Sequence, residues 1–220
     1  MSALVGHRTQ SVGEELANAV SHGLGALLAL AALPLLVWQA ARLGSAPDIV
    51  GACVFGASLL LLYGTSALYH ALPQGGAKRW FNRMDHAAIY VLIAGSYTPF
   101  TLGVLRGPWG WSLFGIVWAA AALGVTVKLL NRLRHPWLST GLYVAMGWVA
   151  VVAIAPMLER MPFAGLAWLV AGGLCYTLGA VVFMLDNKVR YAHAVWHLFV
   201  LGGSICHFFA AFGYARAVPA

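Results

Sequence analysis

Charged residues are scarce in this chain of 220 residues, because only 9% are Asp, Glu, Lys or Arg while 61% are hydrophobic. A soluble domain carries roughly 25% charged residues. The chain therefore has too few polar side chains to solvate its own surface, which excludes an ordinary soluble enzyme or binding domain. We predict an all-α polytopic membrane protein.

Cysteine is also rare, since Cys53, Cys175 and Cys206 stand singly in apolar runs and form no CxxC pair. We interpret them as small buried side chains rather than as a disulfide framework. The chain has no linker long enough to separate domains and no internal repeat. We therefore expect a short N-terminal segment at residues 1–16 and a single transmembrane domain at residues 17–220.

Two acidic residues directly precede the first apolar run. Glu14 and Glu15 stand where a secretory signal peptide would need positive charge. We expect this segment to be retained as a membrane span.

Seven apolar segments are present, each long enough to cross about 30 Å of hydrocarbon at about 1.5 Å per residue. Short breaks that contain proline, glycine or charged residues separate them. We expect a bundle of seven transmembrane helices, at residues 17–41, 48–72, 85–105, 109–131, 137–157, 162–185 and 192–214.

Basic residues are distributed unevenly between the two sides of such a bundle. The side of the N-terminus holds nine of them: Arg8, Lys78, Arg79, Arg83, Lys128, Arg132, Arg134, Lys188 and Arg190. The other side holds four: Arg42, Arg106, Arg160 and Arg216. Cytoplasmic loops are enriched in Lys and Arg, so we expect an inner (cytoplasmic) membrane protein with its N-terminus inside and its C-terminus outside. This asymmetry explains the net charge of +7 without any nucleic acid partner.

Polar side chains inside the apolar segments are functional candidates, because such groups are costly in a bilayer. Ser66 and His70 lie four residues apart at the end of the second segment. Asp85 begins the third, and His193 and His197 lie four apart at the start of the seventh. Residues four apart share a helix face. The predicted topology brings all five residues to the cytoplasmic end of the bundle.

Other polar residues of these segments are not predicted to be site residues. Asn18 and His22 begin the first segment at the same end, also four residues apart. His86 follows Asp85, but neighbouring helix residues point about 100° apart, so we do not expect it to be a direct ligand. His207 lies alone in the outward half, and we interpret it as an ordinary buried residue.

His70, His193 and His197 supply three imidazoles from two helices, and imidazole is a common zinc ligand. Three protein nitrogens with one open position are typical of a catalytic zinc, which lowers the pKa of a bound water to about 7. Asp85 would accept a proton from that water or orient it, and Ser66 would hydrogen-bond the water or a substrate carbonyl. The same spacing also fits a metal-free hydrogen-bond network that holds the helices together.

These motifs resemble the signature of the hemolysin III family, the bacterial branch of the progestin and adipoQ receptor (PAQR) superfamily. The resemblance rests on Ser66-x-x-x-His70, Asp85 and His193-x-x-x-His197. It extends to Glu14-Glu15, Asn18, Ser21-His22-Gly23 and the stretch 93–100, and so covers essentially the whole chain.

The resemblance implies an intramembrane Zn²⁺ near the cytoplasmic face, with the three histidines as ligands and Asp85 and Ser66 beside it. Related eukaryotic receptors are linked to the hydrolysis of lipid amides such as ceramide, and bacterial members to the control of membrane fluidity. We therefore expect a zinc-dependent hydrolase of a ceramide-like or acyl membrane lipid, acting in membrane lipid homeostasis.

A second hypothesis is a non-enzymatic sensor or regulator of membrane fluidity, in which zinc is structural. A pore or transporter is disfavoured, because the polar groups crowd one end instead of running through the full depth of the bundle.

Overall fold

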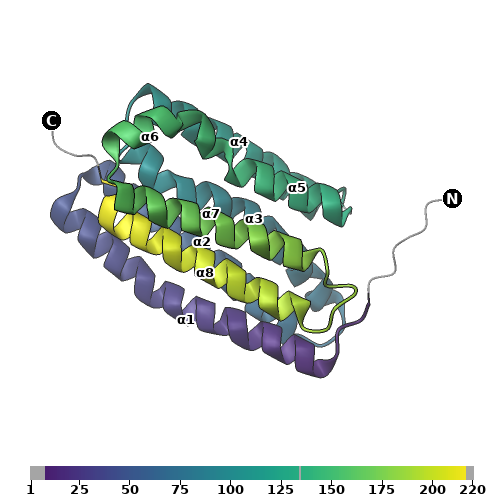
Figure 1. Ribbon diagram of the computed structural model, residues 1–220. Coiled ribbons are helices and arrows are strands. Elements are labelled where there is room, and N and C mark those ends of the chain that lie inside the picture. Colours follow the sequence, from purple (N-terminus) through teal and green to yellow (C-terminus); the bar gives the residue numbers. More distant parts are fainter. Residues whose placement is uncertain (1–7, 134, 217–220) are drawn as a thin grey trace.

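The computed structural model describes residues 8–133 and 135–216, so residues 1–7 of the predicted N-terminal segment, and Arg134, lie outside the described residues. Every regular element in these two ranges is helical, which confirms the all-α prediction (Figure 1). The elements are α1 (Val12–Leu43), α2 (Ala46–Ala71), α3 (Gly76–Leu102), α4 (Pro108–Leu129), α5 (Pro136–Gly147), the 3-10 helix η1 (Val149–Ala153), α6 (Ile154–Arg160), α7 (Phe163–Phe183) and α8 (Ala192–Tyr214).

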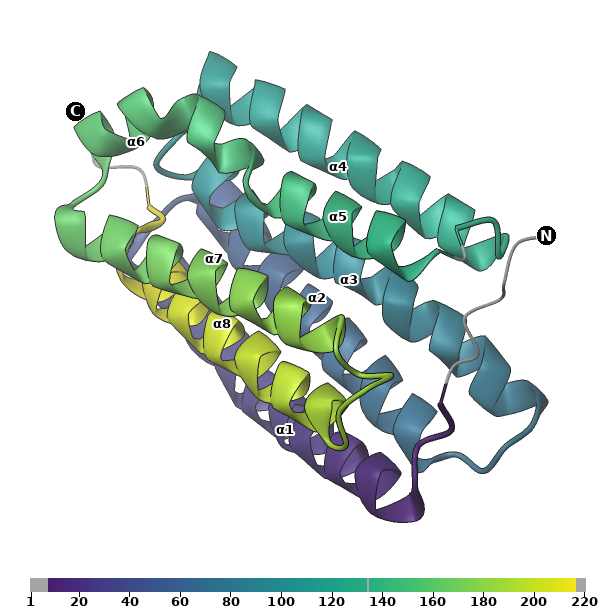
Figure 2. The same ribbon diagram turned by 45° about the vertical axis from the view of Figure 1, so that its right-hand side comes forward.

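The helices form an antiparallel bundle, in which a helical rod occupies each of the seven predicted segments and α5, η1 and α6 together make the fifth. α2 packs against α1 and α3, α8 packs against α1 and α7, and α4 packs against α3. Figure 2 shows that the start of α1, the end of α2 and the start of α8 lie at the same end of the bundle.

Six stretches of helix are long and apolar enough to cross a membrane: α1, α2, α4, the rod from α5 to α6, α7 and α8. Large apolar side chains such as Leu27, Trp111 and Phe209 are exposed along them. Extensive apolar surface of this kind is typical of lipid contact. α3 is not one of the six, since its first half carries charged residues that include Lys78 and Asp85. The fold is that of a multi-pass membrane protein.

α3 begins earlier than the sequence predicts, at Gly76 and not at residue 85. Asp85 therefore lies inside the helix, and its predicted position at the head of the segment is wrong. Hydropathy marks only the apolar part of a helix, and the first turns of α3 are polar. These turns have a packing role, because Lys78 Nζ donates hydrogen bonds to the Tyr69 and Leu72 carbonyls at 3.0 and 3.2 Å, at the end of α2.

The fifth rod is broken near its middle, although the sequence predicts one continuous helix there. Pro156 lacks the N–H that would bond the Val152 carbonyl, and its ring crowds that carbonyl, so the preceding turn tightens into η1. The Tyr97 hydroxyl of α3 donates to the Gly147 carbonyl at 2.7 Å and accepts from the Ala150 N–H at 2.9 Å. These bonds satisfy backbone groups that lipid cannot satisfy.

α2 is the most buried of the six candidate spans. Its side chains Phe55 and Tyr63 are almost fully buried and belong to the main hydrophobic core. Gly51 permits a close approach to α3, since a Cβ atom at this position would lie only 2.7 Å from Pro99 Cα. The polar residues of α2, including His70, are thus carried by the helix that the bundle holds most firmly.

Candidate metal centre

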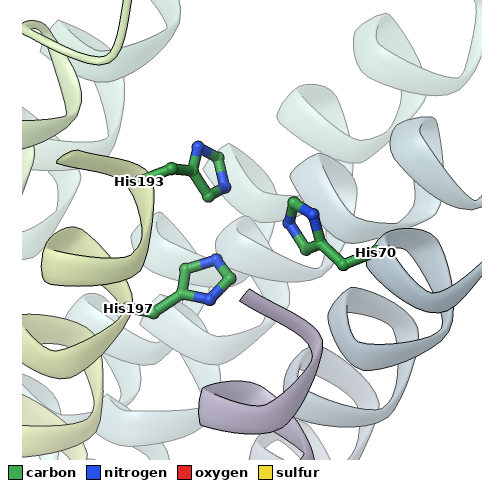
Figure 3. A group of neighbouring side chains, drawn as sticks. All are labelled: His70, His193 and His197. Carbon is green, nitrogen blue, oxygen red and sulfur yellow. The ribbon is translucent and has the colours of Figure 1, made fainter. Parts of the chain in front are cut away.

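Three histidines meet at one end of the bundle. His70 comes from the last turn of α2, and His193 and His197 lie one turn apart at the start of α8. Figure 3 shows the three rings turned toward one another, and one ring nitrogen of each lies within 4.8 Å of those of the other two. Their exposed fractions are 4%, 6% and 0%. Residues far apart in the sequence therefore form one compact, buried cluster.

Two of these rings are oriented by carboxylates. His70 Nδ1 donates to Glu15 Oε2 at 2.7 Å, and His193 Nδ1 donates to Asp186 Oδ2 at 3.1 Å. Gln10 Nε2 also donates to Asp186, at 3.3 Å, and so helps to hold this carboxylate in place. An ionised carboxylate only accepts hydrogen bonds, so the proton of each ring is assigned to Nδ1.

The third ring is oriented by the backbone of α1. His197 Nδ1 lies 3.3 Å from the Asn18 carbonyl oxygen and 3.0 Å from Ser21 Oγ, whose hydroxyl donates to the same carbonyl. A carbonyl can only accept, so the proton of this ring is also assigned to Nδ1. Metal-binding histidines usually donate their second ring nitrogen to a carboxylate or a backbone carbonyl. All three rings follow this pattern.

The opposite nitrogen, Nε2, has no hydrogen-bond partner in any of the three rings, within the part of the chain that the structure describes. Buried polar atoms are nearly always paired, so three unpaired acceptors in one cluster indicate a ligand. Neutral imidazole nitrogens are good zinc donors, at about 2.1 Å. Tetrahedral bonds of that length would place the nitrogens about 3.4 Å apart, so small side-chain rotations would close the cluster. The residues present fit a zinc ion.

The start of α1 also fixes the start of α8. The Ser11 hydroxyl caps α1 through the Glu14 N–H, and the Glu14 carboxylate in turn accepts from the Ser11 N–H at 2.9 Å. The same carboxylate accepts from Arg8 at 2.6 Å and from the Tyr191 N–H at 3.0 Å. Tyr191 has a left-handed φ of 60° directly before α8. One carboxylate thus joins both helix ends beside His193.

A second polar group lies deeper in the bundle. His22 stacks on His197, with ring centroids 3.4 Å apart and planes inclined by 8°. Its Nδ1 is hydrogen-bonded to Ser66 Oγ at 2.7 Å, and the Ser66 side chain also interacts with the Asp85 carboxyl. Ser66 and Asp85 are 0% and 2% exposed. His22 therefore connects the histidine cluster with the two predicted catalytic residues.

A cavity of about 670 Å³ adjoins these residues. His22, Asp85 and His193 line it, and it extends along the bundle to Tyr176 and His207. Leu92, Ile93, Phe183 and Val200 belong to a wall that is mostly apolar. The volume lies within the range of about 300–1,000 Å³ that is usual for small-molecule sites. A ligand with a long apolar part would fit this shape.

Comparison with known proteins agrees with these features. The family profile described as "Haemolysin-III related" matches residues 10–208, which is most of the chain. The chain belongs to the hemolysin III family. It is 45% identical to Hemolysin-3 of Bacillus cereus over 206 residues, which are 94% of each chain. It is 44% identical to the Hemolysin-3 homolog of Bacillus subtilis (strain 168) over 209 residues, 95% of this chain and 98% of the relative.

A more distant relative of this hemolysin III family member is the human monocyte to macrophage differentiation factor. It is 29% identical over 175 residues, which cover 77% of this chain and 72% of the human protein. The resemblance predicted from the sequence motifs is confirmed.

The geometry of this hemolysin III protein can now be compared with the predicted site. The structure brings His70, His193 and His197 together and places Ser66 one turn deeper on α2. It leaves Asp85 outside the histidine group, where its carboxyl interacts with Ser66.

The two remaining histidines of the predicted spans also line the cavity. His86 Nδ1 donates to the Asn82 carbonyl of its own helix at 2.8 Å, and His207 Nε2 lies 3.4 Å from the Leu169 carbonyl. Neither belongs to the three-histidine group.

The sequence analysis did not predict the side chains that orient the three histidines. Glu15 carried a usable signal, because Glu15, Asn18 and His22 lie three or four residues apart and form one polar face on an apolar helix. Asp186 carried none, since it lies in the connection before α8 and its contact with His193 depends on how that connection folds.

We expect Glu15→Gln and Asp186→Asn each to weaken zinc binding by about 10- to 100-fold, because each removes a carboxylate that orients a ligand. Competition with a chromophoric chelator, using purified protein, measures this change. Glu159→Gln is the matched control, since Glu159 is exposed at the other end of the bundle. Unchanged zinc affinity in both site variants would show that these carboxylates do not support the metal.

Proposed function

We propose that this hemolysin III family protein crosses the inner membrane seven times, with its N-terminus in the cytoplasm and its C-terminus outside. The odd number of rods supports this, since it separates the start of α1 from the end of α8. The distribution of charge supports it as well. Eight of the nine basic residues predicted to be cytoplasmic are described, and they lie at the end of the bundle that holds the histidines.

The protein is a zinc-dependent hydrolase of an amide or ester bond in a membrane lipid. His70, His193 and His197 would hold the metal, each offering an unpaired Nε2. Bound zinc would supply a Lewis acid that polarises a carbonyl and activates water near neutral pH. The observation that carries this proposal is the set of three unpaired Nε2 atoms beside a large, mostly apolar cavity.

Asp85 and Ser66 have separate roles in this reaction. Asp85 accepts a proton from the attacking water, and its position in the cavity wall gives it access to that water. Ser66 turns its single hydroxyl hydrogen from Asp85 to the substrate oxygen as negative charge develops there. His22 holds the Ser66 hydroxyl through the bond between its Nδ1 and Ser66 Oγ. Burial of all three side chains favours these interactions, because water competes with them poorly.

The shape of the cavity supports a lipid as the substrate. A ceramide-like or other acyl lipid would place its amide or ester at the histidine end and its chain along the apolar wall. Hydrolysis there would change membrane lipid composition, consistent with a role in membrane homeostasis.

Turnover of ceramide by the purified chain in lipid nanodiscs tests this function. Zinc-loaded protein should release fatty acid, and chelation should slow that release by about 100-fold or more, because Lewis-acid catalysis contributes several kcal/mol. Added zinc should restore the rate. Metal-independent turnover, or none from fully zinc-loaded protein with ceramide or a simple acyl ester, would contradict the proposal.

A second candidate is a non-enzymatic regulator of membrane fluidity with a structural zinc. One observation favours it, since the metal would join α2 directly to α8 and, through Glu15, Asn18 and Ser21, would also tie in α1. The two functions differ in what they require of Asp85, which only the hydrolase needs.

A further inference from the structure

The cavity wall carries more basic than acidic side chains. Five basic residues line the cavity: Arg8, Lys78, Arg79, Arg83 and Lys128. Three acidic residues line it: Glu15, Asp85 and Asp186. Two of these acids are already engaged with the histidines, since Glu15 binds His70 and Asp186 binds His193. The cavity charges are therefore not balanced within its own wall.

Pairing accounts for only two of the five cations. Arg8 pairs with Glu14 at 2.6 Å, and Lys78 pairs with Glu15 at 2.9 Å. The other three cations, Arg79, Arg83 and Lys128, have no carboxylate partner among the residues that the structure describes.

These three cations form a basic rim, the name used below for Arg79, Arg83 and Lys128. Lys128 Nζ donates to the Leu133 carbonyl at 3.2 Å. Arg79 and Arg83 have neither an ion pair nor a side-chain hydrogen bond within the described ranges, although Arg83 is half-buried. Two guanidinium groups that line the cavity thus have all their donors available with respect to the described residues.

The basic rim and the histidine cluster come from different helices. Arg79 and Arg83 lie four residues apart on one face of α3, and Lys128 lies near the end of α4, which packs against α3. The histidines come from α2 and α8. One cavity is therefore lined both by the basic rim and by His193 of the histidine cluster, and the rest of its wall is mostly apolar.

We propose that the cavity binds a lipid with an anionic headgroup, held by the basic rim. The planar guanidinium of arginine matches the oxygens of a phosphate or carboxylate, and two of them four residues apart can bind one headgroup together. The acyl part lies along the apolar wall, which brings its linkage near the histidines. This inference rests on the proposed function for the place of the linkage, but the headgroup site itself needs neither zinc nor turnover.

The same end of the bundle also has basic residues that do not line the cavity, and these can be compared with the basic rim. Arg132 and Lys188 lie at the same end and are exposed, but they do not line the cavity. General attraction between a basic surface and anionic lipid would depend on these residues as much as on the basic rim. A headgroup site would depend on the basic rim alone.

Native mass spectrometry of the full chain in detergent tests the proposal, with phosphatidylglycerol, phosphatidylcholine and glycerol phosphate as probes. We expect phosphatidylglycerol to bind at least about 10-fold more tightly than phosphatidylcholine, with or without chelator. The double variant Arg79→Gln/Arg83→Gln should lose about 10- to 100-fold of the affinity for phosphatidylglycerol and keep that for phosphatidylcholine. The control Arg132→Gln/Lys188→Gln also removes two positive charges, and its affinity for phosphatidylglycerol should stay within about 2-fold of that of the unchanged protein.

Three outcomes would overturn the proposal. Equal losses in both double variants would indicate general surface attraction, and no preference for phosphatidylglycerol would exclude an anionic headgroup. Glycerol phosphate binding as tightly as the lipid would assign the basic rim to a soluble anion. If the variant Arg79→Gln/Arg83→Gln does not fold, the variant Arg79→Lys/Arg83→Lys replaces it in the test. This variant keeps both positive charges and should retain part of the affinity for phosphatidylglycerol. Native mass spectrometry measures lipid binding and does not require hydrolysis. The headgroup proposal can therefore be tested even if the hydrolase assay shows no turnover.

Discussion

We expect purified His70→Gln protein to retain almost no zinc. Structural zinc sites with four protein ligands have apparent binding free energies of about 10–16 kcal/mol. One ligand therefore contributes about 3 kcal/mol, and its loss should weaken binding by about 100-fold or more. Glutamine is similar in size and polar, so this substitution removes the Nε2 donor without opening a large hole beside Glu15. Metal analysis after dialysis against a weak chelator measures the effect.

His207→Gln is the matched control for this prediction. His207 lines the same cavity but lies outside the three-histidine group, so its variant should keep about one zinc per chain if the unchanged protein does. Normal zinc content in folded His70→Gln protein would show that His70 does not bind the zinc. Circular dichroism and gel filtration check folding in both variants.

We expect Asp85→Asn to keep zinc and fold but to reduce turnover by about 100- to 10,000-fold. General acid–base catalysis contributes an effect of this size, and an amide cannot accept the proton. Asparagine is nearly isosteric with aspartate and can still contact Ser66, so packing should be preserved. Initial rates of fatty acid release, measured beside zinc content in the same preparations, separate chemistry from metal loss.

Asp48→Asn is the control for removing a buried carboxylate. Asp48 is also buried, but it caps α2 at the opposite end of the bundle through Ser45 and Arg106. Its variant should keep full turnover per folded molecule. If Asp85→Asn and the unchanged protein hydrolyse the lipid equally well, Asp85 is not the base. If neither has turnover while both hold zinc and restore membrane fluidity in cells, the regulator is favoured.

The meeting of His70, His193 and His197 could be predicted because it follows from regular geometry. His193 and His197 share a face of α8 through their spacing, and an antiparallel order of helices brings them to the end where α2 delivers His70. The start of α8 at Ala192 coincides with the predicted start of the seventh segment. The helical spacing of residues and the antiparallel order of the helices are enough to predict that these three histidines meet.

Features that depend on irregular backbone were not predictable in the same way. The contact between Asp186 and His193 is set by the turn before α8, where Tyr191 has a left-handed conformation. The early start of α3 places polar turns on a helix that hydropathy detects only in part, which is why Asp85 was expected at its head. The break at η1 depends on the partners that Tyr97 offers, as much as on Pro156.

The distribution of the cluster over the chain bears on the order of assembly. Its orienting groups include Glu15 and Asn18 on the first helix, one of its histidines lies on the second helix, and two lie on the last. A ribosome makes these segments in that order, so the three Nε2 atoms cannot meet until α8 has been inserted and has docked against α1. Zinc uptake would then mark the last step of biogenesis, and zinc content would report the fraction of chains that completed it.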